Sequence, residues 1–290
     1  MIGARTRWSS KRWWAAALLL ALPVAAPAMA GAGASPWAST EQSQVRLISA
    51  MTAVGDRASL SLGLHIRLEP GWKTYWRSPG DAGFPTLLDW SGSANLAAAE
   101  LHWPAPKRFR IFGLETFGYV DEVVLPVTLS LARPGQAAAL KVRVDYAICK
   151  DICIPHEAEL ALDLGAGAAR ASPYAGLIER YLSRVPARGP SAELAIEGVT
   201  VRGAVPTQVL EVSARARRPF VAPDLIVEGP AGYFFGAAQV SFRDAGLGAR
   251  LAAPVTTRQG LGSLAGQALT VILIDGERAV EREVAPSAAD

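Results

Sequence analysis

Cys149 and Cys153 are the only two cysteines of the 290-residue chain, and they enclose the tripeptide Lys150-Asp151-Ile152. In an oxidising compartment, two thiols this close form a disulfide unless something keeps them reduced. On a straight strand, four residues at about 3.3 Å each would separate the two Cα atoms by about 13 Å. A disulfide requires less than about 7 Å. The chain must therefore reverse direction at the tripeptide, and the flanking residues favour a β-hairpin with a three-residue tip.

The alternation of apolar residues on both sides of the cysteine pair indicates which way the thiols face. The apolar positions are even-numbered before the pair and after it: Leu140, Val142, Val144, Tyr146 and Ile148, then Ala158, Leu160, Leu162 and Leu164. Successive side chains point to opposite faces of a strand, so the odd-numbered Cys149 and Cys153 are predicted to point away from the core. We expect both thiols to be accessible to a partner protein on that face.

Three kinds of chemistry stay open for this pair on the residues alone. In the chain-entropy model, a five-residue ring stabilises a fold by only about 2 kcal/mol, against about 4.7 kcal/mol for a 100-residue loop. Small exposed rings are typical of exchangeable disulfides, so thiol exchange is favoured over a structural staple. Cys149, Cys153 and His156 would also suit copper(I). The segment is similar to the Cys-x3-Cys-Pro segment of the Sco copper chaperones, but without their thioredoxin-like βαβ pattern.

Residues 1–30 have the features of a secretory signal peptide: four basic residues at the start, an apolar stretch over 13–26 and the small-residue site Ala28-Met29-Ala30. Without them the chain has 25 basic and 26 acidic residues. The basic character of the whole chain therefore belongs to the signal, and no nucleic-acid-binding surface is indicated. No later apolar run approaches the length of a membrane span, so the mature chain is expected not to span the membrane and to lie in the periplasm.

Hydrophobic patterns predict an all-β protein in two parts. Short alternating strands, such as the one over residues 58–68, indicate an antiparallel sandwich over residues 40–166. In that strand His65 is predicted to lie on the solvent-exposed face. Two segments rich in Gly, Pro and aromatic residues, 77–85 and 107–119, are interpreted as long loops. A short helix that starts at Ser172-Pro173 occupies the linker over 167–191. A second, smaller β-sandwich-like domain is expected over 192–286; it has no Cys or His, and we expect a structural or docking role for it.

These segments resemble the N-terminal periplasmic domain of DsbD, the membrane thiol:disulfide interchange reductase, and of the related ScsB proteins. The resemblance covers about residues 43–165, with the Tyr-x-x-Cys hairpin that ends in Cys-Ile-Pro as its most specific part. The other matching segments are Gly71-Trp72-Lys73-Thr74-Tyr75-Trp76, Ser78-Pro79-Gly80-Asp81, Phe112-Gly113, Tyr119 and Leu125-Pro126-Val127. The resemblance implies an immunoglobulin-like sandwich with Cys149 and Cys153 as its redox pair. It also implies a cap loop containing Phe112 and Tyr119, with Phe117 as an alternative shielding residue.

In this family the disulfide relays electrons between proteins without a cofactor, and it is associated with cytochrome c biogenesis and copper tolerance. The resemblance therefore implies thioredoxin-like periplasmic partners. Because the chain has neither the membrane domain nor the thioredoxin-like domain of DsbD, a membrane electron donor would come from a separate chain. The predicted function is periplasmic thiol:disulfide interchange. The alternatives are a copper(I)-binding accessory protein that uses Cys149, Cys153 and His156, and a non-catalytic β adaptor.

Overall fold

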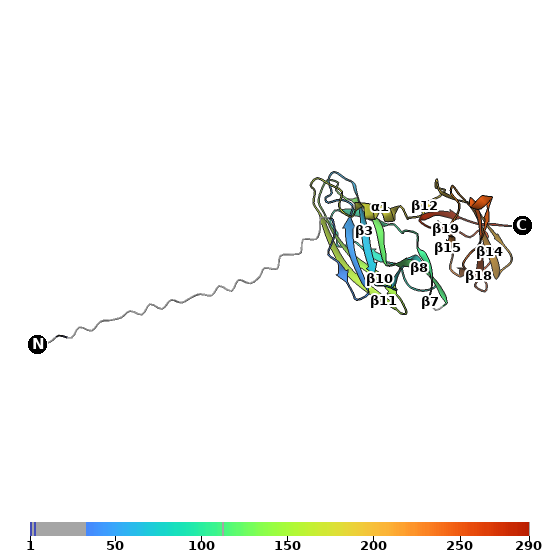
Figure 1. Ribbon diagram of the computed structural model, residues 1–290, viewed down its shortest axis with the longest axis horizontal. Coiled ribbons are helices and arrows are strands. Elements are labelled where there is room, and N and C mark those ends of the chain that lie inside the picture. The colour runs from blue at the N-terminus through green and yellow to red at the C-terminus, as the bar shows by residue number, and fades with distance from the viewer. Residues whose placement is uncertain (2, 4–32, 112, 290) are drawn as a thin grey trace.

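The computed structural model describes residues 1, 3, 33–111 and 113–289. Apart from two isolated residues, the signal peptide expected over 1–30 lies outside this part, as does Phe112. In the described residues no helix has the length and apolarity needed to cross a membrane. Figure 1 shows two groups of strands that follow one another along the long axis of the molecule, with one short helix near their junction.

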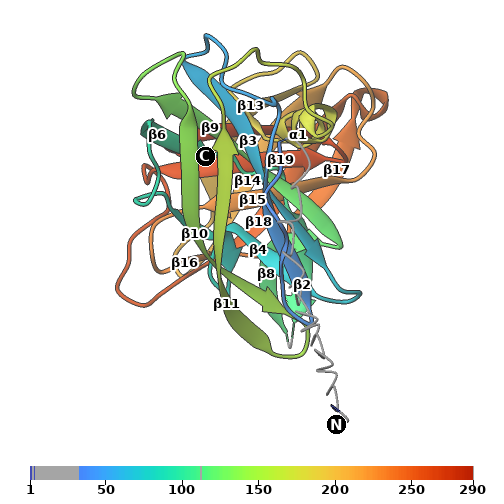
Figure 2. The same cartoon turned by 90° about the vertical axis from the view of Figure 1, so that its left-hand side faces the viewer.

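The first group of strands is an antiparallel sandwich of two sheets, as the alternation predicted. One sheet has the order β1-β2-β3-β9-β6, formed by Ala38–Ser39, Ser43–Ser49, Ser59–Leu68, Glu122–Leu131 and Leu96–Leu101. The other has the order β11-β10-β4-β8-β7, formed by Cys153–Leu164, Ala138–Cys149, Lys73–Gly80, Leu114–Val120 and Lys107–Ile111, with β5 (Leu87–Asp89) on β10. Figure 2 shows β10 and β11 as two long neighbouring strands.

The core of this sandwich is formed by the side chains predicted from the alternation. The even-numbered residues of β10 are buried in it, including Tyr146, and Trp76 of β4 is completely buried. Leu160, Leu162 and Leu164 contribute the matching even positions of β11. The face that β10 and β11 turn away from this core is therefore the odd-numbered one, which carries the cysteines.

The segments interpreted as loops, 77–85 and 107–119, are in large part strands. β4 continues to Gly80, and β7 and β8 form a hairpin. Position 118 requires a glycine, because a Cβ at Gly118 would overlap the carbonyl oxygen of Thr74 on the neighbouring strand. A glycine that permits close approach of two backbones looks in sequence like a glycine of a turn. The composition therefore misled the loop prediction.

His65 is also placed differently from the prediction. It lies on β3, but it is 0% exposed because Trp37 covers it, with ring centroids 4.9 Å apart. Its Nε2 donates to the Glu122 carboxylate at 2.7 Å, and Arg46 Nε donates to its Nδ1 at 3.3 Å. Burial lowers the pKa of His65, although Glu122 opposes the shift.

The predicted helix is α1, Ala175–Leu182. Ser172 Oγ accepts the backbone N–H of Tyr174 just before it. Its buried residues, Ile178 and Tyr181, pack into the core of the first sandwich. The helix is thus fixed to the first group of strands, and the chain then enters the second.

The second group of strands is also all-β and has its own core. One sheet has the order β12-β20-β19-β15, formed by Ala187–Arg188, Arg278–Val284, Leu269–Asp275 and Pro223–Glu228. The other has the order β16-β18-β14-β13-β21, formed by Tyr233–Phe235, Gly248–Thr257, Thr207–Ala216, Leu194–Arg202 and Ser287–Ala288, with β17 (Gln239–Arg243) on β18 and the 3-10 turn Asp244–Gly246 between them.

The two groups of strands meet at β15 and β19. Val271 and Leu273 of β19 face the second core, whereas the alternate residues Ile272 and Ile274 join the first core. Ile226 of β15 joins it too. Strand β19 is therefore buried on both of its faces.

Candidate functional site

Cys149 and Cys153 form a disulfide at the tip of the β10–β11 hairpin. They are direct partners in the strand register, their Cα atoms are 4.2 Å apart, and three residues make the turn between them. The backbone N–H of Lys150 donates to the carbonyl of Ile152 at 3.1 Å across this turn. The register continues past Pro155 without a shift. The predicted reversal of the chain at residues 150–152 is confirmed.

The two cysteines differ sharply in solvent exposure. Both cysteines are on the face that points away from the main core, but Cys149 is only 1% exposed and Cys153 is exposed. Cys149 belongs to a small separate cluster with Tyr75 and Ala147. The prediction that both thiols are accessible is therefore wrong for Cys149. Its strand, β10, has β4 alongside, whereas β11 is at the edge of its sheet.

Tyr75 is the side chain that covers Cys149. Its hydroxyl donates to Cys149 Sγ at 2.7 Å and lies 3.1 Å from Cys153 Sγ. Tyr75 is 1% exposed, and burial raises its pKa, so the hydroxyl stays protonated at neutral pH and can donate. The sequence did not single out this residue, because aromatic residues of a strand more often belong to a core. No local signal marked it, because the face that it shares with the cysteines depends on the pairing of β4 with β10.

A short loop packs on the other side of the Tyr75 ring. Gly83 lies against the ring so closely that a Cβ at this position would overlap it, and its φ of +93° favours glycine in addition. Asp81, two residues earlier, is held to β8 by two hydrogen bonds: Asp81 N–H to Glu115 O, and Glu115 N–H to Asp81 Oδ2, both 2.8 Å. We call residues 81–83 the covering loop.

Two lysines lie close to the hairpin tip. Lys73 is the register partner of Cys149 on β4, and its Nζ is 5.2 Å from the centroid of the Phe109 ring. Lys150 lies over Gly71, where an ideal Cβ would be 3.1 Å from its Cε. Cations beside a thiol favour the thiolate form. Lys150 would favour a thiolate at the hairpin tip and Asp151 in the same turn would oppose it, so the charges of the turn favour neither form.

His156 is not part of this site. It is the register partner of Tyr146, and the two rings stack with centroids 5.4 Å apart on the face opposite to the cysteines. Its Nε2 is buried without a hydrogen-bond partner, and burial lowers its pKa. The ligand set Cys149, Cys153 and His156 is thus not brought together. Within the part of the chain that the structure describes, no group of three or more potential His, Cys, Asp or Glu ligands is found.

The structure also places Tyr119 away from the disulfide. Tyr119 pairs with Thr74, which pairs with Ile148, so its side chain is on the core face of the sheet. It is buried in the main core, and its hydroxyl donates to the carbonyl of Pro104 at 2.7 Å. A cap-loop role for Tyr119 does not fit this position. Phe117 packs against the same core, and Phe112 is outside the described residues.

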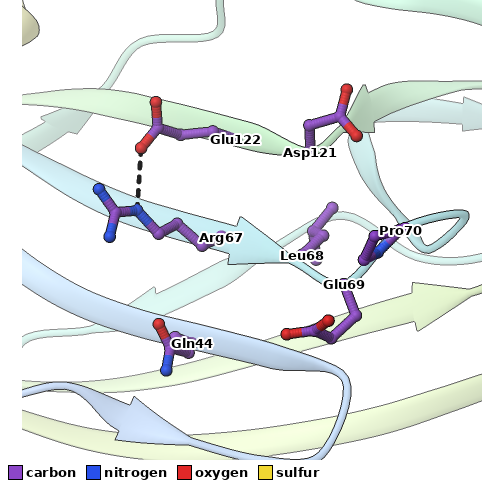
Figure 3. Close-up of a pocket in the computed structure, with 7 residues that line it drawn as sticks. All are labelled: Gln44, Arg67, Leu68, Glu69, Pro70, Asp121 and Glu122. Atoms are coloured by element: carbon purple, nitrogen blue, oxygen red, sulfur yellow. Dashed lines mark hydrogen bonds and ion pairs between the residues drawn. The ribbon is translucent and has the colours of Figure 1, made fainter.

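A separate pocket of about 350 Å³ opens on the other sheet. Figure 3 shows Gln44, Arg67 and Glu122 on three neighbouring strands, with the Arg67–Glu122 contact of 3.0 Å drawn as a dashed line. Its lining side chains are mostly charged and include neither cysteine. We therefore locate the candidate site at the hairpin tip and not in this pocket.

Comparison with known families agrees with this location. A family model described as thiol:disulfide interchange protein DsbD, N-terminal, matches residues 44–164. This part of the chain is therefore similar to the N-terminal domain of DsbD. A second model, described as Domain of unknown function (DUF8393), matches residues 184–289. A search of curated proteins found no match.

Both groups of strands also match a solved structure. The crystal structure of the N-terminal periplasmic domain of ScsB from Proteus mirabilis aligns with a TM-score of 0.70 and 22% identity, covering 90% of this chain and 100% of that one. The predicted all-β, immunoglobulin-like fold is confirmed. Another structure, BspA_C_WT, is 8% identical over 80% of this chain and 93% of that one, with a TM-score of 0.18.

Proposed function

We propose that this chain is a periplasmic thiol:disulfide interchange protein that relays electrons through its Cys149–Cys153 disulfide. The observation that carries the proposal is the asymmetric disulfide itself: Cys153 is an exposed residue, whereas Cys149 is buried and accepts a hydrogen bond from the Tyr75 hydroxyl. The position of the disulfide in a segment similar to the N-terminal domain of DsbD supports the same role. A purely structural disulfide would need neither an exposed cysteine nor a hydroxyl donor placed beside its sulfurs.

The geometry supports a defined order of steps. A thiolate of the partner attacks Sγ of Cys153, the more exposed of the two cysteines, the Cys149–Cys153 bond breaks, and a mixed disulfide forms between Cys153 and the partner. The electron pair of the broken bond leaves on Cys149 as a thiolate, to which Tyr75 donates its hydrogen bond. A second thiol of the partner then resolves the mixed disulfide. The partner leaves as a disulfide, and the chain keeps two thiols and two electrons.

The same steps in reverse would oxidise the chain and reduce a partner. We propose thioredoxin-like periplasmic proteins as partners, with a membrane electron donor supplied by a separate chain. The ScsB domain that shares this fold is a periplasmic domain. The proposed organisation has a cleaved signal over residues 1–30, the redox domain over 40–166, a helical linker over 167–191 and a second β domain over 192–286.

Single cysteine variants test the proposal. Cys149→Ala leaves the exposed thiol of Cys153, which should form a stable mixed disulfide with a thioredoxin-like partner on a non-reducing gel. Cys153→Ala leaves the covered thiol and should form much less. The double alanine variant is the control and should form none. Wild-type activity in the double variant would instead support the non-catalytic adaptor, and absence of every covalent complex would contradict the relay.

A further inference from the structure

The second sandwich presents a set of carboxylates to the disulfide-bearing sheet, and the proposed function gives them no role. Arg77, on β4, is held by two of them. Its Nη2 is 2.8 Å from Glu228 Oε2 and 2.7 Å from Glu281 Oε2, and its Nε donates to Glu228 Oε1 at 3.0 Å. All three side chains are largely buried, with the Glu281 side chain 12% exposed. A guanidinium that bridges two carboxylates in this way forms strong and directional hydrogen bonds.

A second arginine makes a parallel connection. Arg108, on β7, donates from Nε and Nη2 to the two oxygens of Asp224, both at 3.0 Å, and from Nη2 to the Leu225 carbonyl at 2.6 Å. Its Nη1 contacts the carboxylate of Glu115 on β8. Asp224 and Leu225 belong to β15 of the second sandwich. The β7–β8 hairpin is thus attached to the second sandwich.

Both connections lead to the cover of Cys149. Arg77 is two residues from Tyr75 on the same strand, and its guanidinium lies 4.5 Å from the ring centroid of the intervening Trp76. Arg108 holds Glu115, whose backbone is hydrogen-bonded to Asp81 at the start of the covering loop. The covering loop in turn packs on the ring of Tyr75. Two separate sets of contacts therefore connect the second sandwich to Tyr75, whose hydroxyl contacts both sulfurs.

We propose that the second sandwich, through Arg77 and Arg108, holds Tyr75 and the covering loop over Cys149 and thereby directs exchange to Cys153. The two arginines are positioning residues, and the inference rests on the proposed function. Removal of either guanidinium leaves a largely buried carboxylate without its partner, which favours separation of the contact. The cover then opens more often, and small thiols reach Cys149 as well as Cys153.

The chain offers a matched control. Arg184 follows α1 and pairs with Glu277 in the β19–β20 turn, so this contact also joins the two sandwiches. Its guanidinium pairs with Glu277 and lies over the Tyr181 ring, and neither of these residues is on β4 or on the β7–β8 hairpin. A variant at Arg184 therefore weakens the junction without touching the cover.

The experiment measures access to Cys149 directly in the full-length mature chain. In a Cys153→Ala background, the lone Cys149 thiol is labelled with iodoacetamide in Arg77→Gln, Arg108→Gln and Arg184→Gln variants. We expect labelling about tenfold faster for the first two, equivalent to about 1.4 kcal/mol in the opening equilibrium, and unchanged for Arg184→Gln. Arg77→Lys should be intermediate, because an ammonium lacks the planar fork that bridges two carboxylates.

Equal rates in all variants, or an equal increase in the Arg184 control, would overturn the inference. If an arginine variant does not fold by circular dichroism, Glu228→Ala and Asp224→Ala weaken the same two connections from the other side and must also accelerate labelling. The proposed function fails separately, if Cys149→Ala makes no mixed disulfide with any thioredoxin-like protein. Labelling of Cys149 is measured without a partner, so the two failures are distinguishable.

Discussion

The two strands of the cysteine hairpin carry equivalent residues in very different surroundings. Cys149 on β10 and Cys153 on β11 are register partners on one face of one sheet. Yet β10 has β4 beside it, which brings Tyr75 over Cys149, while β11 is the last strand of its sheet and leaves Cys153 exposed. The face of a strand follows from the parity of its residues, but access depends on the lateral neighbour.

The strongest test of this comparison is the reactivity of each thiol alone. The lone Cys153 thiol of Cys149→Ala should react with iodoacetamide about a hundredfold faster than the lone Cys149 thiol of Cys153→Ala. An opening that costs about 3 kcal/mol produces this ratio, since each 1.4 kcal/mol is a factor of ten. Denatured samples of both variants are the control and should react alike. Similar rates in the folded proteins would contradict the difference in accessibility between Cys149 and Cys153.

Loss of the Tyr75 hydroxyl should have the next largest effect. Tyr75→Phe keeps the ring and removes the donor to Cys149 Sγ, which costs about 1.5 kcal/mol or more if the sulfur leaves as a thiolate. We expect reduction of the disulfide by a partner protein to slow about tenfold, measured by stopped-flow fluorescence. Tyr146→Phe is the matched control, because that hydroxyl bonds Ser43 at 2.9 Å on the opposite face. Equal effects in both variants would contradict the role of Tyr75.

A smaller effect is expected from the covering loop. Gly83→Ala places a Cβ against the Tyr75 ring and should lower the free energy of unfolding by about 1–3 kcal/mol more than a substitution without a clash. Gly260→Ala is the comparison, since Gly260 has a similar φ of +89° and nothing within 4 Å of its ideal Cβ. Chemical denaturation measures both. Identical losses would show that only the backbone conformation matters.

The smallest effect should come from the sheet that does not carry the disulfide. Burial lowers the pKa of His65 below its ordinary 6.5. The unfolded chain therefore binds a proton at this histidine more readily than the folded chain does. The contribution of neutral, buried His65 to the free energy of unfolding is complete above pH 6.5 and is lost as the pH falls towards the folded pKa. His65→Gln should flatten this dependence in thermal unfolding between pH 7 and pH 5. Exchange at the disulfide should not change, and a change would link the two sheets.

Much of the fold and of the site was predictable from local alternation. The hairpin, its three-residue tip and the outward parity of Cys149 and Cys153 all followed from residues close in sequence. Tyr75 did not, since it is 74 residues from Cys149 and meets it only because β4 pairs with β10. The spacing of residues within one segment does not predict which distant strand will pair with it.

The remaining errors have the same physical origin. His65 has the alternation of a half-exposed strand, but Trp37, which precedes it by 28 residues, covers it. Tyr119 was given a role from its motif, whereas its register with Thr74 turns it into the core. In both positions a long-range neighbour, and not the local pattern, decides what the side chain contacts.

Strand β19 has a consequence for the behaviour of the whole chain. Its alternate residues fill two cores, with Val271 and Leu273 in one and Ile272 and Ile274 in the other. Neither core can lose this strand without opening the other. Heating should therefore melt the chain in a single cooperative transition, and a protease should find no folded fragment that survives cleavage between the two halves.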